Sequence, residues 1–373
     1  MTEGDLKHTL GIVRQLAGSF RVYTCATRRL SMAGVSRSTS INLRCPPVAD
    51  SAAWLRWLDA AIRRHRIDQV IPVGHEACAL LARHRDRWLP RTRIVLPEAS
   101  KVDLALDKRA TNHLGEALGL SVPRLAQPRS IGDIHACADQ VGYPLVIKEA
   151  VEGSSDVAYV DDRYGLERTL AAFLARNRWS EPYLPIFQQR IVGPGFGVFA
   201  TYQDGRCRRI MAHRRIREYP PTGGYSTCAE LWADPVLLEH GRRMLDALGW
   251  HGVAMVEFKR HDVDGRYYLM EVNPKLWGSL DLALAAGCDF PGDLCAIADG
   301  ADLPEMQPPT ARLRFCWPIS GDLPYLVRRP GAWRAVLGDW TNPTVRTNLD
   351  WSDPFPHVVE LAVAVRGLVR DLT

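Results

Sequence analysis

The sequence has little lysine. Of its 47 lysine and arginine residues, six are lysine and the other 41 are arginine. The net charge is +5, and acidic residues are interspersed among the arginines. A nucleic-acid-binding protein more often concentrates its charge on one element, so we expect no nucleic-acid partner. In a chain that favours arginine so strongly, we expect lysine where a compact point charge is needed. The six are Lys7, Lys101, Lys108, Lys148, Lys259 and Lys275.

Cysteine pairs and long apolar runs are also missing. The nine cysteines include no C-x-x-C pair, which argues against a zinc ribbon or a disulfide framework. No uncharged apolar run approaches the roughly 20 residues that a membrane span needs. The first ten residues, MTEGDLKHTL, are polar and do not resemble a signal peptide. We therefore expect a protein of the reducing cytoplasm with no membrane partner.

Several motifs of phosphate and acyl chemistry are absent. No lysine follows a glycine, which excludes a P-loop. The tripeptide HRD at residues 84–86 has no asparagine at kinase spacing, and no G-x-S-x-G nucleophile elbow occurs. Phosphate chemistry in this chain would therefore need a different set of residues.

The first hundred residues alternate helix and strand patterns. We predict helices over residues 9–16, 52–64 and 76–88, and strands over residues 20–24, 69–73 and 93–96. Such alternation favours a parallel sheet with Rossmann-like crossovers. Only about seven residues precede the first helix, so we expect the usual opening strand to be missing or replaced.

The pattern in the middle of the chain predicts an α+β arrangement. Two hairpins are predicted, one turning at Asp204-Gly205 and the other near Asp264-Gly265, dipeptides that favour tight turns. Residues 301–373 are rich in proline and tryptophan and finish with an apolar helix predicted over residues 358–369. The sequence assigns this tail no function.

The stretch LMEVNPKLWGS, residues 269–279, suggests a metal site. With the second hairpin centred on Asp264, Glu257 and Glu271 each lie seven residues from the centre and face each other. Asn273 lies two residues further on and shares that face. Opposed carboxylates destabilise a sheet unless something neutralises them. Oxygen ligands of this kind suit Mg²⁺, which commonly takes one or two carboxylates together with substrate phosphates.

Five stretches, in this order, resemble the ATP-grasp ligases. They are LALDKRATNHLGEALGLSVPR, YPLVIKEAVEGSSDVAYV, PIFQQRIVGPG, VAMVEF and LMEVNPKLWGS. The resemblance implies a Rossmann-like N-terminal domain at residues 1–104 and a two-subdomain ATP-grasp fold, with subdomains at residues 105–183 and 184–300. A C-terminal extension at residues 301–373 would follow. Within the family, the sequence is most similar to the carbamoyl-phosphate-synthase-like carboxylate–amine ligases.

The resemblance also implies roles for individual residues. The metal, Mg²⁺ or Mn²⁺, would be held by Glu257, Glu271 and Asn273, and Lys275 would act as a catalytic cation. The ATP-binding residues would be Lys108, Lys148, Gly153, Ser154, Ser155, Gln188, Gln189, Arg190 and Ile191. The sequence departs from the family at three points: Gln189 replaces an acid, no ribose-binding acid follows Ile191, and Lys275 replaces an arginine.

The acid substrate needs a cation of its own. Arg215 and Arg217 alternate on a predicted strand, which would turn them to the same face. The following Gly223-Gly224 would allow close backbone approach. We prefer Arg215, because Arg217 has Glu218 adjacent to it as a candidate ion-pair partner.

These observations predict an ADP-forming ligase. The family typically phosphorylates a carboxylate and lets an amine attack the acyl phosphate, so we expect amide or peptide bond formation from small acids and amines, possibly amino acids. Two alternatives stay open: carboxylation or carbamoylation through carboxyphosphate, and an ATP-binding scaffold or sensor without turnover. A homodimer is also left open.

Overall fold

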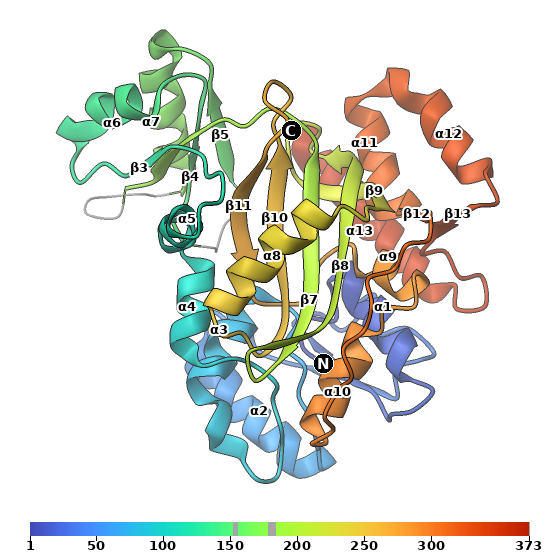
Figure 1. The fold of residues 1–373 in the computed structure, drawn as a ribbon. Helices are drawn as coiled ribbons and strands as arrows, with labels where there is room; N and C mark the ends of the chain where they lie inside the picture. Colours follow the sequence, from blue (N-terminus) through green and yellow to red (C-terminus); the bar gives the residue numbers. More distant parts are fainter. Residues whose placement is uncertain (152–155, 178–183, 373) are drawn as a thin grey trace. The chain divides into compact units, whose positions relative to one another are not determined.

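The computed structural model describes residues 1–151, 156–177 and 184–372 (Figure 1). The chain divides into two compact units. Unit 1 consists of Met1–Val102, Gly195–Met255 and Asn273–Thr373, and unit 2 consists of Asp103–Pro194 and Val256–Val272. No helix in the described part is long and apolar enough to cross a membrane.

Unit 2 is built on an antiparallel four-stranded sheet. The strand order is β3 (Leu125–Ala126), β6 (Ile186–Gln189), β4 (Leu145–Lys148) and β5 (Val157–Val160). Helices α6 (Ile134–Val141) and α7 (Leu166–Asn177) pack on one face, where the core includes Leu145, Ile147, Phe187 and Leu170 (Figure 1). Because strand residues alternate between faces, Val146, Lys148 and Gln188 lie on the opposite face.

Unit 2 also contains α5 (Lys108–Ala117) and most of the second predicted hairpin. The hairpin strands are β10 (Gly252–Arg260) and β11 (Tyr267–Asn273), which are neighbours in the sheet order. Gly265 has a positive φ of 69°, which the turn requires and which glycine adopts without strain. The helix α4 (Ala99–Leu106) leads into α5.

The N-terminal part of unit 1 contains α1 (Lys7–Leu16), α2 (Ser51–His65) and α3 (His75–His84), close to the predicted helices. Strands β1 (Tyr23–Ala26) and β2 (Ile41–Arg44) pair in parallel. The residues ahead of α1 bond to their neighbours on both sides, since Thr2 N donates to Ile71 O and Cys25 N donates to Met1 O. A short segment that is hydrogen-bonded to both neighbours, rather than a full strand, therefore precedes the first helix.

The two strands predicted over residues 69–73 and 93–96 were wrong. The structure has a single parallel bridge there, between Gln69 and Arg93. Pro72 lies in the first of these segments and has no N–H, so it cannot continue a ladder of hydrogen bonds. The pairing therefore stops after one bridge.

The larger sheet of unit 1 contains β7 (Gly195–Gln203), β8 (Arg206–Tyr219), β9 (Tyr225–Leu231), β12 (Arg314–Cys316) and β13 (Val345–Thr347), in that order. The first residues of β10 follow β7 on the other side. The predicted turn between β7 and β8 is confirmed, with positive φ at Asp204 and Gly205. The remaining helices of this unit are α8 (Pro235–Ala247), α9 (Leu280–Ala285), α10 (Phe290–Ala298), α11 (Leu323–Arg328), α12 (Trp333–Thr341) and α13 (Phe355–Leu372).

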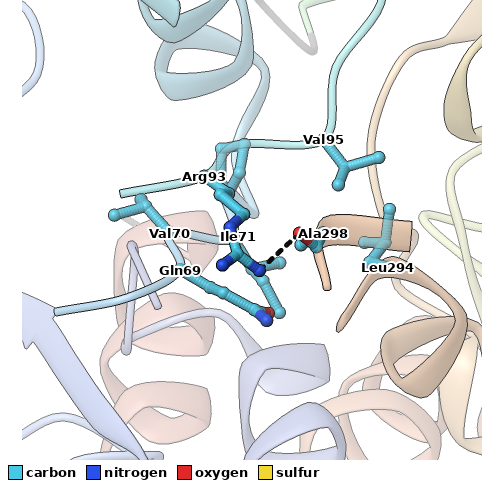
Figure 2. A pocket seen from close by; sticks show the side chains of 8 residues that line it. Gln69, Val70, Ile71, Arg93, Val95, Leu294 and Ala298 are labelled. Carbon is cyan, nitrogen blue, oxygen red and sulfur yellow. Dashed lines mark hydrogen bonds between the residues drawn. The ribbon is translucent and has the colours of Figure 1, made fainter. Parts of the chain in front are cut away.

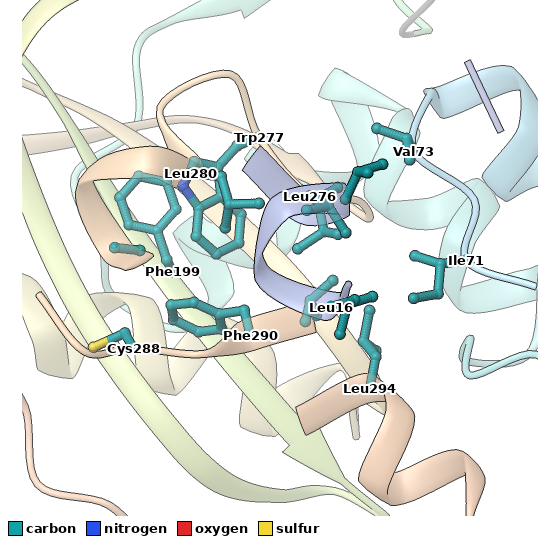
Figure 3. Close-up of a cluster of buried hydrophobic side chains, with 14 of the residues drawn as sticks. Leu16, Ile71, Val73, Phe199, Leu276, Trp277, Leu280, Cys288, Phe290 and Leu294 are labelled. Carbon is teal, nitrogen blue, oxygen red and sulfur yellow. The ribbon is translucent and has the colours of Figure 1, made fainter. Parts of the chain in front are cut away.

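An aromatic core fixes the end of the LMEVNPKLWGS stretch in unit 1. Trp277 stacks on Phe199 with ring centroids 4.2 Å apart and meets Phe290 edge-on at 4.9 Å (Figure 3). Leu276 is fully buried in the same cluster, which also contains Val73 of the N-terminal segment. Burial of these two side chains is worth several kcal/mol, about 1.5–3 for each large apolar residue. The backbone that carries Lys275 is therefore anchored immediately after that residue.

Candidate functional site

Unit 2 brings Lys108 and Glu271 together. Asp107 caps α5 by accepting hydrogen bonds from the N–H groups of Arg109 and Ala110, so the helix begins at Lys108. The Lys108 Nζ lies 3.7 Å from Glu271 Oε2, and the side chains are 7% and 22% exposed. A pair so poorly screened by water attracts more strongly than a surface pair. A predicted phosphate-binding cation and a predicted metal ligand thus share one location.

The packing of α5 against β11 explains this proximity. Leu269 and Glu271 share a face of β11, because they lie two residues apart on a strand. A Cβ atom at Gly115 of α5 would lie 2.7 Å from Leu269 Cδ2. Glycine therefore permits a close approach of α5 to this face of β11. The N–H of Leu269 also donates to Ser121 O, just beyond α5.

The other two predicted metal ligands, Glu257 and Asn273, lie on β10 and β11. Glu257 lies on β10, the neighbour of β11, and is partly buried. Its direct opposition to Glu271 stays a prediction. Asn273 ends β11, is 6% exposed and belongs to unit 1, as does Lys275.

Lys148 and Gln188 share the face of the unit 2 sheet that lies away from α6 and α7. Lys148 pairs with Ile186 and Gln188 pairs with Val146, which fixes both on that face. Lys148 is 9% exposed and Gln188 is 2% exposed. Polar side chains buried on the face away from the helices are unusual, because burial of a polar group is costly without a partner.

The remaining predicted nucleotide residues have structural partners. Gln189 accepts a hydrogen bond from Arg124 N through its side-chain oxygen. The Arg190 guanidinium pairs with Asp161 at 2.9 Å, and the Arg190 N–H donates to Pro144 O. Ile191 is buried. Gly153, Ser154 and Ser155 lie outside the described residues.

In unit 1, Arg215 and Arg217 do not share a face. Arg215 pairs with Ala229 of β9, whereas Arg217 pairs with Cys228, the adjacent residue. The bulge between them places two residues of β8 against one of β9, so the alternation is broken. Neighbours on β9 point to opposite faces, and paired residues share a face. The expectation of a common face was therefore wrong.

Arg217 is held by acids of the C-terminal extension. It donates from Nε and Nη2 to the two oxygens of Asp322, each at 3.0 Å, and also pairs with Asp339. Burial raises the pKa of Asp339, but hydrogen bonds from Arg217 and Arg314 outweigh this and lower it. The suggested pairing of Arg217 with Glu218 was wrong, because both acids come from residues more than a hundred positions away.

Two thiols complete the surroundings of Arg217. Cys228 and Cys316 lie opposite each other on β9 and β12, and with Asp339 their ligand atoms lie within 4.8 Å of one another. Arg217 Nη2 donates to Cys316 Sγ at 3.4 Å. Two guanidinium groups beside this cluster oppose a further cation. We interpret the cluster as a structural network.

Arg215 lies on the other face, in different surroundings. Its side chain is 8% exposed; Nη1 donates to Gly224 O at 3.1 Å and lies 3.5 Å from Glu218 Oε1. A Cβ at Gly195 would lie 2.9 Å from Arg215 Cδ, so glycine there permits this packing. His213 shares this face, and burial, followed by the charge of Arg215, keeps its pKa well below the usual value.

Two residues of the first helix, His8 and Lys7, were not predicted as site residues but lie close to residues that were. Burial, the charge of Lys275 and that of Lys7 lower the pKa of His8 to about 3, so His8 is neutral near Lys275. Lys7 lies between the rings of Tyr225 and Trp317. The scarcity of lysine was the one signal in the sequence that could have marked Lys7.

A shallow hollow in unit 1 carries no assigned ligand. It is lined by residues that include Gln69, Arg93, Leu294 and Ala298 (Figure 2). Arg93 Nη1 donates to Ala298 O at 2.8 Å, and Gln69 Nε2 donates to Asp299 Oδ1 at 2.7 Å. Its polar groups are therefore already bonded within the protein.

Known proteins match the chain in sequence and in fold. Residues 196–317 match the family described as ATP-grasp in the biosynthetic pathway with Ter operon. The D-alanine–D-alanine ligase of Stutzerimonas stutzeri (strain A1501) is 30% identical over 218 residues, which cover 52% of this chain and 65% of that protein. The corresponding ligase of Xanthomonas axonopodis pv. citri (strain 306) is 48% identical over 184 residues, covering 46% and 55%. The chain thus spans somewhat less than two thirds of these relatives.

Solved structures share the fold. An L-amino acid ligase from Bacillus licheniformis has a TM-score of 0.62 at 17% identity, covering 79% of this chain and 72% of that one. A biotin carboxylase from Campylobacter jejuni has a TM-score of 0.64 at 16% identity, covering 81% and 71%. Such low identities establish the architecture and not the reaction. Taken with the family match over residues 196–317 and the related ligases, they show that the chain is similar in sequence and in fold to ATP-grasp ligases.

Proposed function

We propose that the protein is an ATP-dependent carboxylate–amine ligase that forms an amide or peptide bond through an acyl phosphate. The observation that carries the proposal is the 3.7 Å approach of Lys108 to Glu271 in unit 2. It joins a phosphate-binding cation to a metal-binding acid, and both residues lie in stretches that resemble the family. The ligases related in sequence support the same reaction class.

The nucleotide is assigned to residues of unit 2. Lys108 and Lys148 would offset the charge of the phosphates, and Gly153, Ser154 and Ser155 would cover them. Gln188, Gln189, Arg190 and Ile191 would border the adenine. Because the N–H groups of Gln189 and Arg190 already donate to Arg124 O and Pro144 O, we assign base recognition to the backbone of Ile191.

The proposed metal is Mg²⁺, or Mn²⁺ in its place. Glu257, Glu271 and Asn273 supply two carboxylates and an amide, an all-oxygen set that fits such an ion. When bound, the ion would neutralise charge on the β- and γ-phosphates. The proximity of Lys108 to Glu271 fits this role, because both groups would meet the same phosphates.

The acid substrate is assigned to unit 1. Arg215 would orient the carboxylate through paired hydrogen bonds, and Lys275 would stabilise charge on the transferred phosphoryl group. A carboxylate oxygen attacks the γ-phosphorus while the bond to ADP breaks. The amine then attacks the acyl carbon, phosphate leaves, and the amine loses a proton. Arg217 was also predicted to be catalytic; its ion pairs with Asp322 and Asp339 make it the weaker candidate.

The finer organisation is part of the proposal. We propose the domains that were predicted from the sequence. They are a Rossmann-like domain at residues 1–104, ATP-grasp subdomains at residues 105–183 and 184–300, and an extension at residues 301–373. Small carboxylates and amines, including amino acids, are the proposed substrates, and the cytoplasm is the proposed location. A homodimer remains a prediction.

One experiment tests the function. Purified protein is given ATP and Mg²⁺ with pools of small acids and amines, and the nucleotide products are separated by chromatography. ADP and phosphate released only with an acid and an amine support the ligase. Release with bicarbonate alone would indicate carboxyphosphate chemistry, AMP would indicate an adenylating enzyme, and binding without any release would indicate a sensor.

A further inference from the structure

Lys7 occupies an unusual position for a lysine. It is the first residue of α1, where the helix dipole disfavours a cation. Its Nζ lies 4.6 Å from the centroid of the Trp317 ring and 4.8 Å from that of Tyr225, and donates to Ser226 O at 3.2 Å. Its Cε lies 3.5 Å from where a Cβ of Gly278 would be, within the LMEVNPKLWGS stretch. Three segments that the sequence singled out or left unassigned therefore meet at this side chain.

The ammonium of Lys7 has more N–H donors than the hydrogen bonds that it makes within the described residues. An ammonium has three N–H donors, and one hydrogen bond holds it, to Ser226 O. Among the described residues, no carboxylate oxygen lies within 4.0 Å of it. Burial lowers the pKa of Lys7 to about 8, a shift that nearby Asp281 opposes. The group is therefore mostly charged at neutral pH, in surroundings that solvate it poorly.

The acids near Lys7 are committed to other groups. Asp281 accepts a hydrogen bond from Trp317 Nε1 at 2.7 Å. Glu360 is bonded to His357 and Asn348, and Asp322 pairs with Arg217. None of these carboxylates supplies an ion pair to the ammonium.

A second cation lies beside Lys7. Arg215 Nη1 donates to Gly224 O, and Lys7 Nζ donates to Ser226 O. These two carbonyls are two residues apart at the start of β9, about 7 Å in an extended chain. The positive charge of Arg215 lowers the pKa of Lys7 in addition to burial. Arg215 also lies 3.5 Å from Glu218 Oε1, so the positive charge that a bound anion would chiefly offset is that of Lys7, which lies in poorly solvated surroundings.

We propose that Lys7 and Arg215 together form the subsite for the carboxylate of the acid substrate. The inference rests on the proposed ligase function and adds Lys7, from the first helix, as a substrate-binding residue. The arginine offers paired hydrogen bonds to the carboxylate. The lysine offers a compact charge on a flexible stem, which can stay in contact with the group while its oxygen becomes phosphorylated. The ligand class is a small carboxylate.

The kinetic test uses Lys7→Met, which removes the charge and keeps the apolar stem, with D-alanine as the acid probe. We expect the KM for the acid to rise about tenfold or more, while the KM for ATP stays within about twofold. Lys7→Arg should recover much of the loss. The matched control is Lys101→Met, because Lys101 also donates to a backbone carbonyl, Gly249 O at 2.8 Å. An unchanged acid KM in folded Lys7→Met, or a fall in kcat alone, would overturn the proposal.

A chemical test separates this proposal from the ligase function. The protein is treated with trace acetic anhydride at pH 8, and acetylation of the six lysines is quantified by mass spectrometry with and without propionate. Propionate should protect Lys7 several-fold and leave Lys101 unchanged. If no acid stimulates ADP release, the ligase proposal fails and labelling alone decides the subsite. Equal labelling of Lys7 with and without propionate would refute the subsite, whatever the enzyme does.

Discussion

The sheet of unit 2 and the β8–β9 pair of unit 1 differ in how they present their charged residues. In unit 2 the ladder from β4 to β6 is regular, so Lys148 and Gln188 emerge on one face as strict alternation requires. Between β8 and β9 a bulge follows Arg215, and Arg217 faces the other way. The alternation rule predicts the face of a strand residue only where the ladder is uninterrupted. Here the bulge turns Arg217 to the other face, and a second register shift before Glu218 restores the original register.

The two regions also differ in what surrounds their cations. Lys108 in unit 2 meets a partly buried acid, Glu271. Arg217 in unit 1 meets two buried acids from the C-terminal extension and is fully committed to them. Arg215, on the other face, contacts Gly224 O and Glu218 and has a second cation nearby. The face chosen by the bulge thus separates a structural arginine from one that is proposed to bind substrate.

The largest effect is expected in unit 2. Glu271→Gln should lower turnover by two or more orders of magnitude, because a lost metal ligand leaves phosphate charge uncovered. ADP release at saturating ATP measures it. Glu98→Gln is the control, since Glu98 also pairs with a lysine, Lys101 at 3.1 Å, but lies outside the proposed site. Full activity of Glu271→Gln would remove the metal assignment and leave the pair with Lys108 as a structural contact.

Breaking the ion pairs of Arg217 should lower the stability of the fold rather than turnover. Asp322→Asn removes a buried partner of Arg217, and a loss of about 3 kcal/mol in the free energy of unfolding is expected. Denaturant titration measures it. In the control, Asp302→Asn, the exposed pair with Arg208 is lost, and such surface pairs contribute less than about 1 kcal/mol. Equal stability of the two variants would contradict a structural role for Arg217.

Substitution of Arg215, which lies on the opposite face from Arg217, should affect use of the acid substrate. Arg215→Lys keeps a positive charge but loses the paired hydrogen bonds, so acid-stimulated ADP release should fall by roughly tenfold to a thousandfold. Calorimetry should show unchanged ATP affinity. The neighbour Arg214 lies on the opposite face, and Arg214→Lys should change neither quantity. A fall in ATP affinity with normal turnover in Arg215→Lys would assign that residue to the nucleotide.

The smallest effect is a pH dependence that belongs to Lys7. Its pKa of about 8 lies below the usual value because of burial, so the free protein loses this proton as the pH rises through 8. Binding of a carboxylate requires the charged form, and the acid KM should therefore rise several-fold between pH 7 and pH 9. The charged groups near Lys7 are Asp281, Glu360, Asp322 and Arg215, none of which ordinarily titrates in that range. Lys7→Arg should flatten the profile; an unchanged rise in that variant would assign the titration elsewhere.

Much of the candidate site was predictable from the sequence. The acid, amide and cation of the LMEVNPKLWGS stretch and the two lysines that are predicted to bind phosphate lie in local patterns. The N-cap at Asp107 and the turn at Asp204-Gly205 are likewise set by interactions within a few residues. The direct opposition of Glu257 and Glu271 stays a prediction, because it depends on the register of the hairpin.

The sequence by itself determined the elements that depend on near neighbours, namely the helices, the tight turn, the metal-type motif and the resemblance to one superfamily. Tertiary structure alone decided which residues those elements meet. The bulge after Arg215 places Arg215 and Arg217 on opposite faces. Arg217 donates to Asp322, which is 105 residues away in the sequence, and Lys7 donates to Ser226, which is 219 residues away. The physical reason is range: caps, turns and alternation are fixed by bonds between residues close in the chain, whereas ion pairs and cation–ring contacts form only after the fold has brought distant segments together.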